Sequence, residues 1–222
     1  VQRYVSKYIS NDPLSNNNNA FKKALLKKSI RNPKNAWNEL LSWLFIKQKE
    51  YKKAFIQEKA LFNRDPNYID TVFRLGEIAY ENNDSKTAKE CFEFILEKTI
   101  FIEEKLSAEL FLLKIVAKNS DKDDSFLYKK VLNKYGVNRN TLEIQLAFAN
   151  YLTFKKNNRV KPHGIEWKRN FQHLMLPFLN PTIFPEDLLP LLANYLINPK
   201  ASTGSDVNLT FALKHYDDNS GK

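Results

Sequence analysis

Two prolines in similar surroundings set a repeating length for the first part of this chain. Pro33 follows Asn32, and Pro66 follows Asp65. Proline cannot continue a preceding helix, but it fits the first turn of the next one. Their separation falls within the period of about 20–50 residues that is typical of stacked repeats, each too small to bury its apolar face alone. The spacing therefore predicts one structural repeat between the two prolines.

The segment between these prolines contains two stretches with helical periodicity. The first stripe follows the i, i+3, i+4, i+7 pattern and comprises Trp37, Leu40, Leu41 and Leu44. After a polar break at residues 47–50, the second stripe comprises Tyr51, Ala54, Phe55, Glu58 and Leu61. Each stripe corresponds to one inward helix face. The short break between the two helices predicts an antiparallel helix pair.

Residues 67–97 show the same pattern more clearly. The stripe of the first helix contains Val72, Leu75, Gly76 and Ala79, and that of the second contains Ala88, Phe92, Ile95 and Leu96. Residues 82–85 form a turn with candidates for the N-cap of the second helix. The small residues Gly76 and Ala88 allow the two helix backbones to approach closely, while large residues fill the gaps between neighbouring units.

This unit resembles the tetratricopeptide repeat, whose period is about 34 residues. The family pattern places a large residue, Leu-Gly and an apolar residue on the first helix. The second helix then carries Ala, an aromatic and an apolar residue, and a proline closes the unit. Residues 72–95 match this order and spacing, and Ile100 stands in place of the closing proline. In the preceding unit, Leu41 stands where the small residue is expected.

The resemblance covers residues 20–155 and implies an all-α fold of antiparallel helix pairs stacked as a short right-handed solenoid. Residues 20–30 indicate a lone second helix preceded by a loop over residues 15–19. A weaker pair follows residue 103, with Gly136 as a helix stop. One more helix is expected over residues 141–154, with the inward residues Leu142, Leu146, Ala149 and Leu152.

The last third of the chain has a different character. Six of the nine prolines lie within residues 162–199, and the repeat spacing is lost there. Apolar stripes predict helices around Trp167 and Leu192, with Pro190 tolerated only in a first turn. A short helix capped by Ser205 is expected over residues 205–216. We therefore predict two domains: helical repeats over residues 1–156, and a proline-rich helical cap or subdomain over residues 157–222.

The residues that catalysis or a cofactor would need are sparse. The five glycines are isolated, so no glycine-rich phosphate-binding loop is present. Cys91 lies on an apolar helix face, where a packed residue is expected rather than a nucleophile. His163, Glu166 and His173 have the wrong spacing for a helical zinc motif. The sequence predicts no enzyme activity, no metal site and no cofactor.

Pairs of adjacent carboxylates have a structural explanation at this level. Glu103-Glu104 and Asp123-Asp124 lie at expected turns or helix starts. Negative charge at a helix N-terminus interacts favourably with the helix dipole. We therefore expect these residues to stabilise helix ends.

Positive charge is concentrated near the start of the chain. The formal net charge is +10, and residues 1–60 contain 13 Lys and Arg against 4 Asp and Glu. Such an excess favours an acidic protein, nucleic acid or an anionic lipid surface, although a solvated basic face is the alternative. The basic patch expected from this region comprises Lys47, Lys49, Lys52 and Lys53.

Aromatic residues lie between these lysines, and they leave two interpretations open. Trp37, Trp43, Phe45, Tyr51 and Phe55 combined with basic groups can stack on and bind single-stranded nucleic acid. Alternatively, the aromatic residues belong to the core of the repeat and the lysines to its outer face.

The preferred function is that of a non-catalytic scaffold or adaptor, because the resemblance implies a concave groove that binds a peptide or a partner-protein segment. Groove candidates are positions on first helices outside the core stripes: Asn38, Ser42, Phe45, Arg74, Glu77, Ile78 and Asn150. Arg74 and the nearby lysines suggest a partner with acidic character. The alternatives are RNA or single-stranded nucleic-acid binding, and an architectural role in a larger assembly.

Cellular location is weakly constrained. The single cysteine allows no internal disulfide, and no apolar run approaches the 18 or so residues of a membrane span. The chain begins at Val1, as a mature chain or an excised fragment would. We expect a soluble protein of the cytoplasm, or of the bacterial periplasm or cell envelope if a signal peptide was removed.

Overall fold

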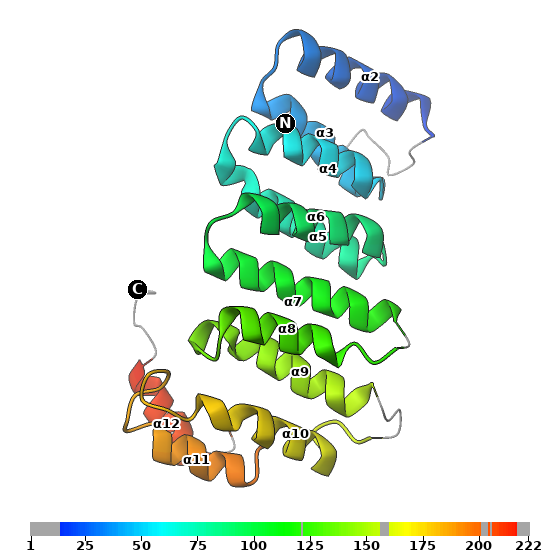
Figure 1. Cartoon of the computed structure of the whole chain (residues 1–222). Helices are drawn as coiled ribbons and strands as arrows, with labels where there is room; N and C mark the ends of the chain where they lie inside the picture. Colours follow the sequence, from blue (N-terminus) through cyan, green and yellow to red (C-terminus); the bar gives the residue numbers. More distant parts are fainter. Residues whose placement is uncertain (1–13, 121, 156–159, 201–203, 205, 217–222) are drawn as a thin grey trace. The chain divides into compact units, whose positions relative to one another are not determined.

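The protein is all-α throughout the part of the chain that the computed structural model describes, which is residues 14–120, 122–155, 160–200, 204 and 206–216 (Figure 1). The chain divides into two compact units, Val1–Ile115 and Val116–Lys222. This division lies inside a helix and differs from the predicted boundary at 156/157. Because the helices on the two sides of that boundary pack together, contacts do not separate the chain there.

The first unit begins with α2 (Asn16–Arg31) and continues with two helix pairs, α3 (Asn35–Lys47) with α4 (Tyr51–Phe62) and α5 (Ile69–Glu81) with α6 (Ser85–Lys98). A 3₁₀ turn, η1 (Pro66–Tyr68), precedes α5, and α7 (Ile102–Asn119) follows α6. The helices of each pair are antiparallel neighbours, and α4 packs on α5 (Figure 1). The two helix pairs predicted over residues 34–97 are therefore confirmed.

The turns inside the two pairs have the same geometry. Between α3 and α4, Lys49 has a φ of +58°, and Glu50 N donates to Phe45 O at 2.8 Å. Between α5 and α6, Asn83 has a φ of +64°, and Asp84 N donates to Ala79 O at 2.9 Å. In each turn a residue in the left-handed region is followed by a residue whose N–H bonds back to a carbonyl in the last turn of the helix. This combination is the Schellman ending of a helix. The structural period therefore runs from Lys49 to Asn83, which is one residue longer than the interval between the two prolines.

Local sequence explains where these helices begin. The Asp84 side chain accepts a hydrogen bond from Thr87 N at 3.0 Å and caps α6, as the turn residues predict. Ser15 accepts from Asn18 N at 3.2 Å, so α2 begins at Asn16. The expected loop over residues 15–19 is wrong, because this serine cap starts the helix one turn earlier.

The core of the first unit is formed by the facing stripes of the helix pairs. Phe92 is buried in α6 and stacks on Phe111 of α7, with ring centroids 4.7 Å apart. Gly76 provides the space for Phe92, since a β-carbon on Gly76 would lie 2.8 Å from the Cζ atom of that ring. The expected role of this glycine in close helix packing is confirmed.

The second unit contains α8 (Ser125–Tyr135), η2 (Arg139–Thr141), α9 (Leu142–Phe154), α10 (Ile165–Met175), η3 (Leu176–Phe178), α11 (Leu189–Ile197) and α12 (Val207–Tyr216). Gly136, with a φ of +79°, ends α8 as predicted. Pro190 lies in the first turn of α11, also as predicted. The expected cap Ser205 lies outside the described residues, and Asp206 accepts from Leu209 N at 3.0 Å.

The inward face of α9 differs from the expected one. Of the four expected inward residues Ala149 is buried, Leu142 and Leu152 are half-buried, and Leu146 is exposed, whereas Ile144 and Phe148 are buried instead. Apolar residues occur on several sides of this helix, so their spacing alone does not select the face that packs. The packed face meets α8, where the ring of Tyr128 stacks on Phe148 with centroids 5.0 Å apart, and it also meets α10.

Candidate functional site

The predicted groove residues of α3 are buried. Asn38 is 6% exposed, Phe45 5% and Ser42 2%. The expectation that they lie outside the core is wrong. Asn38 Nδ2 donates to Gln57 Oε1 at 2.9 Å, and the Ser42 hydroxyl donates to the Glu58 carboxylate. These polar side chains hold α3 against α4.

The three candidates are buried because α3 is covered on most of its circumference. This helix packs against both α2 and α4. Leu40, Leu41 and Leu44 of the predicted inward stripe are buried, and the groove candidates are buried with them. Periodicity within α3 identifies the face toward one neighbour but does not show that a second neighbour covers the rest. Because the turn at Lys49 recurs at Asn83, Ser42 corresponds to Gly76 and Phe45 to the core residue Ala79.

The candidates on α5 lie nearer the surface. Arg74 is exposed, while Glu77 and Ile78 are half-buried. Ile78 packs against the core of the first unit. Their role in binding a partner stays a prediction.

Asn150 belongs to α9 in the second unit. Its side-chain oxygen accepts a hydrogen bond from Trp167 Nε1 of α10 at 2.7 Å. Asn170 Nδ2 donates to Thr153 Oγ1 in the same helix interface, at 3.1 Å. The Asn150 oxygen thus fixes α10 against α9.

The basic patch predicted around the α3–α4 turn is partly neutralised. Lys47 and Lys49 are exposed, but Lys52 pairs with Glu90 and Lys53 pairs with Glu50. The aromatic rings between the lysines are largely internal: Phe45, Tyr51 and Phe55 are buried, and Trp37 and Trp43 are half-buried. Within the described residues these rings form repeat core, and the buried three present no open face to a nucleobase.

A different basic surface was missed in the sequence. The exposed cations of α2 and the turn that follows are Lys23, Lys27, Lys28, Arg31 and Lys34. Residues 13–38 contain neither Asp nor Glu, which is the signal that could have located this surface. We call these five residues the α2 basic face.

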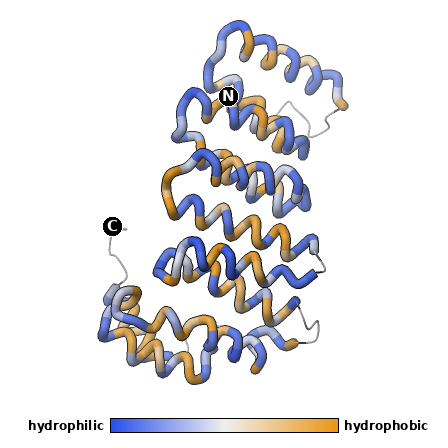
Figure 2. Tube along the Cα trace, in the orientation of Figure 1, coloured by the Kyte–Doolittle hydropathy of each residue, from blue (hydrophilic) through white to orange (hydrophobic). Residues whose placement is uncertain are grey.

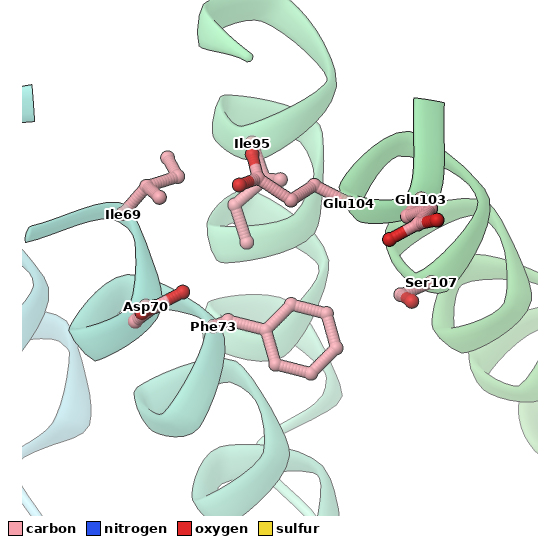
Figure 3. Close-up of a pocket in the computed structure, with 7 residues that line it drawn as sticks. All are labelled: Ile69, Asp70, Phe73, Ile95, Glu103, Glu104 and Ser107. Carbon is pink, nitrogen blue, oxygen red and sulfur yellow. The ribbon is translucent and has the colours of Figure 1, made fainter. Parts of the chain in front are cut away.

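A cleft of about 230 Å³ lies in the first unit where the starts of α5 and α7 approach α6 (Figure 3). Its lining residues are Ile69, Asp70, Phe73, Ile95, Glu103, Glu104 and Ser107. We call it the α5–α7 cleft. Three of these side chains are large and apolar, and three are carboxylates. The lining combines an apolar floor with an acidic rim.

The floor is held in place by aromatic packing. Phe73 contacts Phe92 edge-to-face at 5.4 Å and Phe111 edge-to-face at 5.6 Å between ring centroids. These two partners belong to α6 and α7. Because aromatic pairs prefer this geometry, the Phe73 ring has little freedom to collapse into the cleft. The cleft is therefore largely preformed.

The carboxylates of the rim differ in their partners. Thr99 donates a hydrogen bond to Glu104, which fixes that side chain at the end of the α6–α7 turn. Asp70 and Glu103 come from the first turns of α5 and α7. Neither has a hydrogen bond or an ion pair to any described side chain. All three carboxylates thus line this cleft without a counter-ion among the described residues, in a chain of net positive charge.

An exposed apolar stretch adjoins the cleft. Ile100 and Phe101, in the turn between α6 and α7, are 83% and 65% exposed, and Ile102, the first residue of α7, is 49% exposed. Figure 2 shows this turn as a hydrophobic stretch. We call these three residues the α6–α7 ledge. Scattered apolar residues on a surface are ordinary, but a contiguous group beside a cleft is typical of a binding surface.

Sequence reasoning assigned Glu103 and Glu104 to the helix dipole, and they do lie in the first turn of α7. It missed the cleft because the lining comes from three helices, with residues that range along the chain from Ile69 to Ser107. The signal available was the apolar run of residues 100–102 where the repeat pattern expects proline.

Metal and membrane sites find no support in the described part of the chain. It contains no group of His, Cys, Asp and Glu side chains that could hold a metal ion. His163 instead packs edge-to-face on Trp167, with centroids 4.6 Å apart. None of the described helices is long and apolar enough to cross a membrane.

Comparison with models of protein families, with curated proteins and with solved structures gave no match for this chain.

Proposed function

We propose that this protein is a non-catalytic interaction module of the tetratricopeptide type, which binds a segment of another protein in the α5–α7 cleft. The observation that carries the proposal is the preformed apolar floor of Ile69, Phe73 and Ile95, which opens beside the exposed α6–α7 ledge. Clefts between stacked helices accept the apolar side chains of extended or helical peptides.

Two further features support the repeat assignment. The turn at Lys49 recurs at Asn83, an interval that matches the tetratricopeptide period of about 34 residues. Gly76 lies under Phe92 where the family pattern wants a small residue under a large one. These features concern the helix pairs α3–α4 and α5–α6.

Selection from a displayed peptide library tests this function. The wild-type chain is expected to enrich a common motif, and Ser107→Trp is expected to abolish the enrichment because the indole would fill the cleft. The control is Lys86→Trp, which adds the same group at an exposed site on α6. Equal enrichment by Ser107→Trp and the wild type would contradict the proposal, provided that both chains remain helical by circular dichroism.

Polyanion binding through the α2 basic face is a second candidate function. Five exposed cations lie on or just after one helix that carries no carboxylate. Each cation that neutralises a phosphate releases counter-ions, so affinity should fall steeply with salt. Fluorescence anisotropy with a labelled single-stranded oligonucleotide tests this. Lys23→Glu/Lys27→Glu should weaken binding, whereas the control Lys129→Glu/Lys130→Glu on α8 should not.

A further inference from the structure

We infer that the α5–α7 cleft selects a segment that inserts one large apolar side chain and carries Lys or Arg on both sides of it. This inference rests on the proposed function and specifies the chemistry of the partner. It differs from the acidic partner that the net charge of the chain suggests, because the local charge at the cleft has the opposite sign.

The size of the cleft sets the first requirement. Small-molecule pockets typically measure about 300–1,000 Å³, and this cleft, at about 230 Å³, is smaller. One large side chain from a peptide fits it better than a cofactor does. Phe73 and Ile95 form an apolar floor at the junction of three helices, so an aliphatic or aromatic side chain buries the most area there.

The rim sets the second requirement. Asp70 on α5 and Glu103 on α7 both line the cleft, and Figure 3 shows them on opposite sides of the Phe73 ring. A bound segment would exclude water from around these carboxylates and would strengthen their interaction with its own charges. Basic residues on either side of the anchor would supply the missing counter-ions. Acidic residues there would meet like charges, which disfavours binding strongly.

The ledge extends the contact beyond the anchor. Ile100, Phe101 and Ile102 present apolar surface next to the carboxylate rim. The long methylene stems of Lys and Arg can lie on such a surface while their charged ends reach a carboxylate. An anionic lipid surface, which would also contact an apolar ledge, is disfavoured by the negative rim.

Synthetic peptides provide a direct test. Three fluorescent peptides share a central Phe and differ only in the two residues on each side of it, which are Lys, Ser or Glu. A fourth peptide has the Lys flanks and a central Gly. Fluorescence anisotropy should rank the Phe peptides Lys, then Ser, then Glu, with a step of about tenfold in affinity between the first two. The Gly peptide should bind at least about tenfold more weakly than its Phe counterpart, because it lacks the anchor.

Charge reversal of the rim sharpens the test. Asp70→Lys/Glu103→Lys should invert the ranking, so that the Glu-flanked peptide binds best. The matched control, Glu93→Lys/Glu97→Lys, changes the net charge by the same amount on the exposed face of α6. It should leave the ranking unchanged.

The charge preference and the proposed binding function are refuted by different results. Equal affinity for all three Phe peptides, still abolished by Ser107→Trp, would overturn the charge preference and leave the binding function intact. Binding of none of the peptides, with library enrichment unaffected by Ser107→Trp, would overturn both. Concentration-dependent self-association abolished by the rim variant would make a second copy of this chain the occupant, and would also overturn the inference.

Discussion

The Ser42 hydroxyl donates a hydrogen bond to the Glu58 carboxylate at the place where, one structural repeat later, Phe92 packs over Gly76. Both contacts join the first helix of a pair to its second. In the α3–α4 pair the contact is a buried polar bond, to which Thr71 of α5 adds a second hydrogen bond on Glu58. In the α5–α6 pair it is an aromatic ring over a glycine. The same interface is thus formed by two different chemistries.

Replacing the polar contact of the α3–α4 pair by a ring over a glycine tests whether the two contacts occupy equivalent places. Ser42→Gly and Glu58→Phe should each destabilise the fold by about 1–3 kcal/mol. Ser42→Gly leaves the buried Glu58 carboxylate without this donor, and Glu58→Phe places a larger ring where the Ser42 side chain leaves too little space. The double variant should lose less than the sum of the two, with a coupling of about 1 kcal/mol or more. Urea unfolding followed by circular dichroism measures all three values. Simple additivity would show that positions 42 and 58 do not form this contact.

Gly76→Ala should destabilise the protein by about 1–2 kcal/mol, because the new β-carbon would overlap the Phe92 ring. Helix propensity alone predicts the reverse, a gain of up to about 1 kcal/mol. The sign of the change therefore separates packing from propensity. Thermal unfolding gives the value, and Phe92→Leu in the Gly76→Ala background should recover part of the loss. A stabilised single variant would contradict the close approach.

Glu50 should make stability depend on pH at the junction of α2, α3 and α4. Burial raises the pKa of this carboxyl, but hydrogen bonds from Lys53 and Lys22 outweigh the burial and hold the pKa below its ordinary value near 4.5. A lowered folded-state pKa stabilises the fold above the unfolded value, and this contribution is lost as pH falls through the folded value. Glu50→Gln should therefore cost about 1 kcal/mol near neutral pH.

The difference between wild type and Glu50→Gln should shrink as the pH falls from about 6 to 3. Urea unfolding at a series of pH values measures it. Glu93→Gln is the control, since Glu93 forms an exposed pair with Lys89 on α6. A difference that stays constant over this range would exclude the ion pairs as its cause.

Cys91 should be inert in the folded protein. Burial raises the pKa of its thiol, the nearby Glu58 carboxylate raises it further, and the side chain is fully buried. A thiol reagent needs an accessible thiolate, so labelling by a disulfide reagent at a pH of about 8 should proceed only as fast as the fold opens. Labelling in urea should be rapid, and Lys49→Cys, at an exposed turn, should label rapidly without urea. Equal native rates at the two positions would contradict the burial of Cys91.

Several features of the fold followed from short stretches of sequence. The inward stripes of α4, α5 and α6, the cap at Asp84 and the stop at Gly136 all depend on a few adjacent residues. The inward face of α9 could not be obtained in this way. Leu146 and Phe148 are both apolar, and only the packing of α9 on α8 and α10, in which the ring of Tyr128 stacks on Phe148, decides which of them is covered.

Local sequence is enough to establish that this chain forms short helices, where most of them begin and end, and that they pair. Those properties depend on periodicity, caps and prolines, which act within a few residues of each other. Two features arise only when the chain is folded. One is the packing of α2 and α4 around α3, which places Ser42 in the interior, and the other is the α5–α7 cleft, which gathers Phe73, Ile95 and Glu103 from three helices. Burial and local charge depend on residues brought together from distant parts of the chain, so neither can be obtained from the spacing within one helix.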